Sequence, residues 1–483
     1  MNVMTNLAAA DFKRRMSEVL TRQKAAQVKS GPPSAEVRID RINRAIALLV
    51  DHKEAWLAAL NADFGSRSPD ASLLTDIAGS IGPLKQARAK LKAWMRPERR
   101  APEFPFGLLG AGAEIRFQPK GVVGIIAPWN FPLNLTFAPL AGVLAAGNRA
   151  MIKPSELTPA TSELMAKLIG KAFADEEIAV FTGGPDVGGA FAGLPFDHLL
   201  FTGGTAIAYH IMRAAAENLT PVTLELGGKS PVVLGKSADM ALAAARVMTG
   251  KTLNAGQICL APDYVLAPAE QRLAFVEAAK AAVAAMFPTL KDNPDYTAIV
   301  SQRHFERLKE LVADARAKGG EVIEVNPANE DFSQQEHRKI PPTLILNPTE
   351  DMRVMTEEIF GPILPIKTYG QTAEALAYIN AHPRPLGLYY FGADTGERET
   401  VLNGTISGGV TVNDVIMHVA QEDLPFGGIG PSGMGYYHGR DGFLEFSVRR
   451  AVYRQTPNEK VLSLLRPPYS DRFRQLVGDR VKK

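Results

Sequence analysis

Three polar side chains that could do chemistry stand in distinctive local settings in this chain of 483 residues. The only cysteine, Cys259, lies in NAGQICLAPDY (254–264), where Gly256 and Pro262 indicate a turn. The thiolate is the nucleophilic form of cysteine, and most of an unperturbed thiol is protonated at neutral pH. A catalytic role for Cys259 therefore requires a nearby helix N-terminus, cation or base. The alternative is that Cys259 packs as a small hydrophobic side chain, as free cysteines often do.

A carboxylate and an amide are the two other candidates. Glu225, in TLELGGKSP (223–231), stands alone at the end of an apolar strand, where burial would raise its pKa toward the range of a general base. Its alternative is an ion pair with a basic residue at the strand edge. Asn130, in PWNFP (128–132), follows an apolar strand, and its amide could donate to a developing oxyanion. Asparagine is also a common turn residue, so both interpretations of Asn130 stay open.

The segments that must position these residues alternate between strand and helix patterns. After two or three surface helices within 11–65, a Pro- and Gly-rich stretch at 97–112 indicates a boundary. The patterns that follow predict strands at 122–126, 150–153, 198–203, 230–234 and 264–267, and helices at 133–147, 161–173, from Ala238 onward, near 269–286 and at 301–318. This alternation predicts two α/β units in tandem, each with a parallel sheet.

Two glycine-rich stretches could hold a phosphate. Gly428 to Gly433 reads G-x-G-x-x-G, but Pro431 and the glycines after it do not predict the helix that a dinucleotide motif must open. FTGGT (201–205) does follow a predicted strand and precede a helical stretch, so its backbone amides could bind a phosphate. A βα loop without any ligand uses the same residues.

The overall composition excludes several other classes of protein. A net charge of +3 gives no electrostatic argument for nucleic acid, and the longest nearly uncharged stretch, 135–147, is too short to span a membrane. The eight histidines lack metal-ligand spacing, which predicts no metal site, and His418 and His438 are interpreted as structural. With one cysteine and no recognisable secretory signal, we expect a cytoplasmic protein.

Seven motifs together resemble the aldehyde dehydrogenase superfamily. PWNFP, IKPSE, FTGGT, LELGGKSP, GQIC, EEIFGPILP and LPFGGIGPSGMG occur in the order found in that family, between 128 and 435. WNFPLNLT, APDYVL, NDVIMH and SGMGYYHGRDGF are closest to the class 3-like branch and, within it, to coniferyl-aldehyde dehydrogenases. The resemblance covers residues 37 to 454 and implies NAD(P)-dependent oxidation of an aldehyde to a carboxylic acid.

The resemblance implies a role for each candidate residue. Cys259 would attack the aldehyde to form a thiohemiacetal, Asn130 and the Cys259 N–H would hold the oxyanion, and Glu225 would activate the water that hydrolyses the thioester. The implied cofactor contacts are Trp129 in PWN, Lys153 and Glu156 at the adenosine ribose, Gly203 and Gly204 at the pyrophosphate, Glu358 at the nicotinamide ribose and Phe360 beside its ring.

Some details of cofactor binding are left open by the residues themselves. Glu156 favours NAD, with NADP possible, because its charge would repel a 2′-phosphate. Glu358 could alternatively be a solvated charge on a helix. The family pattern FTGS-T-x-x-G usually ends in glycine, and Ala208 occupies that last position here. Its methyl group could alter the pyrophosphate contact.

The implied architecture is a variant Rossmann cofactor domain (1–100 and 119–226), a catalytic thiol domain (227–442), and an oligomerisation arm with a C-terminal tail (101–118 and 443–483). We expect a homodimer, because the alternating strand SVRRAVYR would otherwise leave an unpaired edge. The expected substrate is an aromatic or unsaturated aldehyde such as coniferyl aldehyde. The alternatives are a broad medium- or long-chain aliphatic aldehyde dehydrogenase, a thiol hydrolase or acyltransferase, and a catalytically inactive binding protein.

Overall fold

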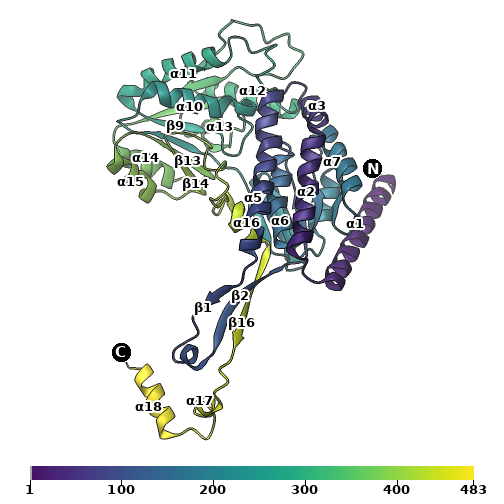
Figure 1. The fold of residues 1–483 in the computed structure, drawn as a ribbon. Coiled ribbons are helices and arrows are strands. Elements are labelled where there is room, and N and C mark those ends of the chain that lie inside the picture. The colour runs from purple at the N-terminus through teal and green to yellow at the C-terminus, as the bar shows by residue number, and fades with distance from the viewer. Residues whose placement is uncertain (1–2, 483) are drawn as a thin grey trace.

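The computed structural model describes residues 3–482 and contains two large sheets and one small sheet on a projecting arm (Figure 1). Both large sheets are mainly parallel and carry helices on their faces. The predicted fold class, two parallel-sheet α/β units with a β arm, is confirmed. Within residues 3–482, every helix is too short or too polar to cross a lipid bilayer.

The first described residues form a series of helices that pack on both faces of the first large sheet. The elements of this series are α1 (Val3–Ser30), α2 (Ala35–Asp51), α3 (Lys53–Phe64), α4 (Pro69–Ser72), the π-helical turn η1 (Leu73–Ala78) and α5 (Gly79–Trp94). The predicted helices within 11–65 are confirmed as α1, α2 and α3, although they do more than cover the surface. Ile42, Leu49 and Trp56 are fully buried, because each helix turns an apolar face toward the core.

The first large sheet has the strand order β15-β7-β6-β3-β4-β5. Its strands are β3 (Val122–Ile126), β4 (Arg149–Lys153), β5 (Ile178–Val180), β6 (His198–Thr202), β7 (Val222–Glu225) and, antiparallel at one edge, β15 (Gly433–Met434). They are connected by α6 (Asn134–Ala146), α7 (Pro159–Ala172), α8 (Pro185–Ala192) and α9 (Thr205–Ala216). Residues of β3 alternate between two apolar cores, one under α2, α5 and α6 and one under α1, α8 and α9. Burial on both faces explains why these strands are almost continuously apolar.

The second large sheet has the strand order β10-β11-β12-β9-β8-β13-β14. Its strands are β8 (Pro231–Leu234), β9 (Tyr264–Pro268), β10 (Glu321–Glu324), β11 (Thr343–Leu346), β12 (Ile363–Tyr369), β13 (Gly387–Phe391) and β14 (Gly409–Val412). The helices around it are α10 (Met240–Thr252), α11 (Arg272–Met286), α12 (Gln302–Ala317), α13 (Arg353–Thr356), α14 (Thr372–Asn380) and α15 (Thr395–Gly404), with 3₁₀ turns η3 (Leu253–Gly256) and η4 (Ala269–Gln271). Only β10 runs antiparallel to its neighbour.

The third sheet forms the arm and joins segments far apart in the sequence. It consists of β1 (Glu98–Arg100), β2 (Gly112–Pro119) and β16 (Ser447–Arg454), with β2 and β16 antiparallel in the register Ile115↔Ala451. Figure 1 shows it extending away from the body, with α17 (Glu459–Ser463) and α18 (Asp471–Arg480) at its far end. The 3₁₀ turn η2 (Phe106–Leu109) lies in the loop between β1 and β2, and α16 (Gly439–Glu445) leads from the body into β16.

The sequence predicted that the G-x-G-x-x-G stretch, 428–433, does not open a helix, and the structure confirms this. It forms a tight turn that ends in β15, where Gly433 pairs with Glu225 of β7. The turn requires glycine for steric reasons, because a Cβ on Gly428 would lie 2.0 Å from the Ser432 carbonyl oxygen. This turn therefore covers the edge of the sheet next to Glu225, and it does not form the helix start that would bind a phosphate.

Candidate active site

A cavity of about 290 Å³ lies at the carboxyl ends of β3, β6 and β7. Most of the residues predicted for the site line it: Trp129, Asn130, Gly203, Gly204, Glu225, Cys259, Glu358 and Phe360. Lys153 and Glu156 do not line it. Residues from five distant motifs converge there. Three of the motifs follow β3, β6 and β7, whose carboxyl ends meet at one edge of the sheet.

Cys259 is presented by a strained turn between α10 and β9. Asn254, Ala255 and Gly256 have φ values of 50°, 52° and 71°, so three successive residues occupy the left-handed region. Gly256 is required there, because a Cβ would lie only 2.3 Å from the carbonyl oxygen of Gly361. Such strain persists where the surrounding structure enforces it, commonly at functional sites. Cys259 itself is partly buried and lines the cavity, which favours a chemical role over the packing interpretation.

The surroundings of Cys259 oppose its ionisation. Burial, followed by the charges of Glu358 and Glu225, raises the pKa of the thiol to about 12, while the N–H groups of Cys259 and Leu260 act in the opposite direction. Burial and negative charge therefore dominate the pKa of Cys259, rather than the cation or helix N-terminus that was expected to lower it. The thiol is protonated at neutral pH and loses its proton only when it reacts or when the charge of the cavity changes.

Glu225 ends β7 as an isolated carboxyl group. It is 2% exposed, and within residues 3–482 neither of its carboxylate oxygens has a hydrogen-bond partner. Burial raises the pKa of Glu225 well above its usual value, with a further contribution from the charge of Glu445. The alternative of an ion pair at the strand edge is wrong. An unpartnered carboxyl group that faces a cavity is free to accept a proton from whatever the cavity holds.

A series of hydrogen bonds holds Glu445 near Glu225. Lys120 Nζ lies 2.9 Å from His198 Nδ1, His198 Nε2 lies 2.7 Å from Thr223 Oγ1, and the Thr223 hydroxyl donates to Glu445 Oε1 at 2.5 Å. Burial, and then Lys120, lower the pKa of His198 to about 3, so the ring is neutral. An ammonium group can only donate, so Nδ1 accepts and Nε2 carries the proton toward Thr223.

One feature of the sequence points to part of this hydrogen-bond network. Thr223 and Glu225 are two residues apart on one strand, so their side chains lie on the same face of the sheet. His198 and Glu445 are too distant in sequence for any such pattern to have connected them.

Asn130 lies in the loop between β3 and α6 and is 3% exposed. Its Nδ2 donates to the carbonyl oxygen of Gln257 at 3.1 Å, two residues before Cys259. The amide has two hydrogens, and this bond engages one of them. The amide thus lies against the cysteine turn, so Asn130 is more than an ordinary turn residue.

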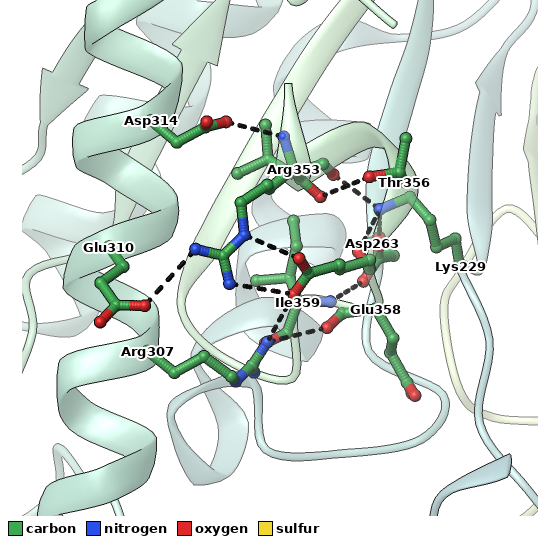
Figure 2. Close-up of polar contacts among 11 residues, drawn as sticks. Lys229, Asp263, Arg307, Glu310, Asp314, Arg353, Thr356, Glu358 and Ile359 are labelled. Atoms are coloured by element: carbon green, nitrogen blue, oxygen red, sulfur yellow. Dashed lines mark hydrogen bonds and ion pairs between the residues drawn. The ribbon is translucent and has the colours of Figure 1, made fainter. Parts of the chain in front are cut away.

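Glu358 and Phe360 are carried by a loop that follows α13 and is fixed from several sides (Figure 2). The Lys229 ammonium pairs with Asp263 and donates to the carbonyl oxygens of Val354 and Glu357 at 2.7 and 2.9 Å. Asp263 Oδ1 accepts from the Ile359 N–H at 2.9 Å. The sequence did not identify Lys229 or Asp263, although Lys229 lies in LELGGKSP.

Arg307 holds the same loop from α12. As Figure 2 shows, its guanidinium donates to the carbonyl oxygens of Glu358, at 3.3 Å, and Ile359. The loop is therefore anchored through its backbone, which leaves the side chains of Glu358 and Phe360 for the cavity.

The side chain of Glu358 faces the cavity without a full set of partners. Burial, followed by the charge of Asp263, raises the pKa of Glu358 to about 8. Its Oε1 has no hydrogen-bond partner in the described part of the chain. The solvated-helix interpretation of Glu358 is thus wrong. Gly227 is the residue that makes room, because a Cβ there would lie 2.2 Å from both carboxylate oxygens.

An aromatic cluster forms one wall of the cavity. The rings of Trp129 and Phe360 meet edge to face, with centroids 5.3 Å apart, and Phe360 has a φ of 49°. His304, which the sequence did not identify, also packs against Trp129, with ring centroids 5.0 Å apart, and Ser301 Oγ lies 2.7 Å from its Nδ1. Burial, and then Arg307, lower the pKa of His304 to about 4, so the ring is neutral.

The remaining predicted residues have definite places. Lys153 ends β4, donates to the Pro154 carbonyl oxygen at 2.8 Å and pairs with Glu156 Oε2 at 3.2 Å. Ala208 lies in the first turn of α9 and is buried in the apolar core, where its N–H donates to the Gly204 carbonyl oxygen at 3.1 Å. His418 and His438 do not line the cavity. Burial lowers the pKa of each to about 4, which fits the structural interpretation.

The residues present fit the dinucleotide that the motifs imply. Gly203 and Gly204 stand at the start of α9. The Gly203 N–H donates to the Glu225 carbonyl oxygen at 3.0 Å, so the N–H groups that favour a phosphate are those of the first turn of α9. Glu358 Oε1, which has no hydrogen-bond partner among the described residues, can accept a hydrogen bond from a hydroxyl group. The absence of a side chain on Gly227 leaves space beside it. The apolar rings of Trp129 and Phe360 supply a flat wall.

Comparisons with known proteins agree with this site. The model of the aldehyde dehydrogenase family matches residues 3–452. The chain is 65% identical, over the whole length of both proteins, to a probable coniferyl aldehyde dehydrogenase of Caulobacter vibrioides. It is 54% identical, over 96% of each chain, to a coniferyl aldehyde dehydrogenase of a Pseudomonas species.

Two solved structures are similar in fold and sequence. The substrate-bound state of Staphylococcus aureus AldH has a TM-score of 0.86 and 33% identity, covering 96% of this chain and 100% of that one. The NAD⁺ complex of Staphylococcus aureus betaine aldehyde dehydrogenase has a TM-score of 0.81 and 26% identity, covering 92% and 88%. The chain therefore belongs to the aldehyde dehydrogenase family, with a nicotinamide cofactor, as its motifs predicted.

Proposed function

We propose that this protein oxidises an aromatic, unsaturated aldehyde such as coniferyl aldehyde to the carboxylic acid. The observation that carries the chemistry is that Cys259, Asn130 and the unpartnered Glu225 share one cavity with Glu358 and Phe360. The substrate class is supported by full-length identity to two relatives named for coniferyl aldehyde.

In the first half of the proposed reaction, Cys259 Sγ forms a bond to the carbonyl carbon. The thiol proton passes to a solvent water molecule in the same step, since the raised pKa of the thiol keeps it protonated beforehand. The carbonyl oxygen becomes negative as the bond forms, and the free hydrogen of Asn130 Nδ2 and the Cys259 N–H stabilise it. The bound nicotinamide supplies the hydride acceptor that converts the thiohemiacetal to a thioester.

In the second half, Glu225 activates a water molecule. Its carboxylate removes a proton as the water oxygen attacks the thioester carbon. The C–S bond then breaks, and the proton held by Glu225 passes to the leaving sulfur, so that the acid and the thiol are released. Burial suits Glu225 to this role, because a carboxylate without partners and with a raised pKa is a stronger base than a solvated one.

The proposed cofactor contacts are those that the family's motifs imply. Lys153 and Glu156 would hold the adenosine ribose, Gly203 and Gly204 the pyrophosphate, and Glu358 the nicotinamide ribose, with Trp129 and Phe360 beside the ring. The carboxylate of Glu156 supports NAD over NADP, because it would repel a 2′-phosphate. Ala208 faces the core, which argues against a direct contact between its methyl group and the pyrophosphate.

The domain assignment and the assembly are also proposals. We assign 1–100 and 119–226 to the cofactor domain, 227–442 to the catalytic domain, and 101–118 with 443–483 to the oligomerisation arm and tail. The long exposed strand β16 on the projecting arm supports a homodimer in which it pairs with a second copy (Figure 1). The single cysteine supports a cytoplasmic location.

A panel of substrates tests the proposal. We expect kcat/KM to be higher for coniferyl aldehyde than for benzaldehyde, hexanal or decanal, and higher with NAD than with NADP. A preference for decanal would replace the aromatic specificity with a long-chain aliphatic one. If no aldehyde produced reduced nicotinamide, the oxidative chemistry itself would be refuted, and a thiol hydrolase would be the better interpretation.

A further inference from the structure

A buried ion pair outside the cavity contacts the loop that carries the oxyanion donor. We propose that Arg67 and Asp76, here called the Arg67–Asp76 clamp, position Asn130 for stabilisation of the oxyanion. The inference rests on the function proposed for Asn130. Neither residue touches the reacting atoms, so both are positioning residues.

The clamp forms hydrogen bonds with the loop between β3 and α6 at two points. Arg67 Nη2 pairs with Asp76 Oδ2 at 2.6 Å, and Arg67 Nη1 donates to the carbonyl oxygen of Asn130 at 2.9 Å. Asp76 Oδ1 accepts from the Leu133 N–H at 3.1 Å. The guanidinium thus fixes the backbone of Asn130, and the carboxylate fixes the backbone three residues later, at the entrance to α6.

The clamp is itself immobilised by its surroundings. The side chains of Arg67 and Asp76 are only 2% and 0% exposed, so water cannot replace either partner. The guanidinium lies over the ring of Phe64, with 4.4 Å to its centroid, and 5.3 Å from that of Phe131. Asp76 sits on the π-helical turn η1, an irregularity of a kind that is frequent at functional sites.

The backbone of Asn130 decides where its amide lies. Besides Arg67, the Asn130 carbonyl oxygen accepts from Asn254 Nδ2 at 3.1 Å, while Asn130 Nδ2 donates to the Gln257 carbonyl oxygen at 3.1 Å. These two bonds join the loop to the cysteine turn, while the clamp holds the same loop through Arg67 and Asp76. Without the Arg67 bond, the side-chain donor left to the Asn130 carbonyl oxygen would be Asn254, which lies on the cysteine turn.

The substitution Arg67→Lys tests this arrangement with the buried charge retained. A lysine can pair with Asp76, but it lacks the rigid planar fork that reaches Asp76 and the Asn130 carbonyl oxygen together. The experiment measures the stopped-flow burst of reduced cofactor with coniferyl aldehyde and NAD. It compares the wild type, Arg67→Lys, Asn130→Ala and the double variant. The Asn130→Ala change keeps the carbonyl group that Arg67 holds, so the cycle isolates the side-chain amide.

We expect Arg67→Lys to slow the burst at least about tenfold in the wild-type background, because small misplacements of catalytic groups are costly. In the Asn130→Ala background the same change should slow it by less than about twofold. The affinity for NAD, followed by quenching of tryptophan fluorescence, should change by no more than about twofold in either background.

Arg38→Lys is the matched control. Arg38 is also buried, 3% exposed, and its Nη1 donates to a backbone carbonyl oxygen at 2.8 Å, but that carbonyl belongs to Ala145 at the far end of α6. We expect a comparable loss of Tm without a change in the burst. If Arg67→Lys failed to bind NAD, the double change Arg67→Met with Asp76→Asn, which removes both buried charges, would take its place in the cycle.

Two outcomes would overturn the inference. An equal slowing by Arg67→Lys with and without the Asn130 amide would mean that Arg67 does not act through Asn130. A burst that survives Asn130→Ala unchanged would refute the oxyanion role itself, and the clamp with it. The two failures are distinguishable, because only the second involves the single Asn130 variant.

Discussion

Replacement of Glu225 by glutamine gives the sharpest view of the second half of the reaction. The substitution keeps the shape of the side chain and removes only its capacity to accept a proton. Because neither carboxylate oxygen has a partner within residues 3–482, no hydrogen bond is lost and the fold should tolerate the change. The effect is therefore expected in the chemistry rather than in stability.

The expected magnitude follows from the role of a general base. Such a base contributes roughly 10²- to 10⁴-fold, which corresponds to about 3–5.5 kcal/mol on the barrier for thioester hydrolysis. Formation of the thioester does not use Glu225 in the proposed sequence. The variant should therefore release about one reduced cofactor per active site at nearly the wild-type rate and then stall.

Stopped-flow absorbance of the reduced nicotinamide measures both phases, and mass spectrometry of the quenched protein should find the acyl group on Cys259. Glu422→Gln is a matched control, since Glu422 also has a buried unpartnered oxygen and a pKa raised to about 7 by burial, but it does not line the cavity. It should leave both phases unchanged. If Glu225→Gln lost the burst and the steady state by the same factor, the assignment of Glu225 to hydrolysis would be refuted.

Three further predictions follow from the same site. Cys259→Ser should abolish both the burst and turnover in the same absorbance assay, because an alcohol is a poorer nucleophile and a poorer leaving group than a thiol; residual turnover above about one per cent would contradict the covalent route. Glu445→Gln removes a like charge that raises the pKa of Glu225, so the acidic limb of the kcat–pH profile should move to lower pH; an unmoved limb would show that the two carboxyls are not coupled. The pKa of Glu358 is raised from 4.5 to about 8, so the folded protein retains a proton that the unfolded chain releases, and wild-type stability should fall as pH rises from about 4.5 to 8, by up to about 5 kcal/mol. Glu358→Gln should lack this loss, and the difference in Tm between the two proteins should grow across that window; a constant difference would refute the raised pKa.

The strands and helices around the first large sheet could be predicted because their signals are local. VVGII at 122–126 and HLLFT at 198–202 are short apolar runs bounded by turns, and each became a buried parallel strand. In the same way, Cys259, Glu225 and Asn130 were recognisable from their immediate neighbours. Residue type and spacing determine what chemistry a segment can supply.

What the tertiary structure decided is which groups meet and which remain alone. That Glu225 lacks a hydrogen-bond partner among the described residues depends on everything packed around it, and the contact of Arg67 with Asn130 joins residues 63 positions apart. Asp263 reaches Ile359 across 96 positions. Such contacts have no periodicity along the chain, because they depend on the crossing of separate strands and helices. The pKa values of the buried groups follow from the same packing, since burial and nearby charges exist only once the chain has folded.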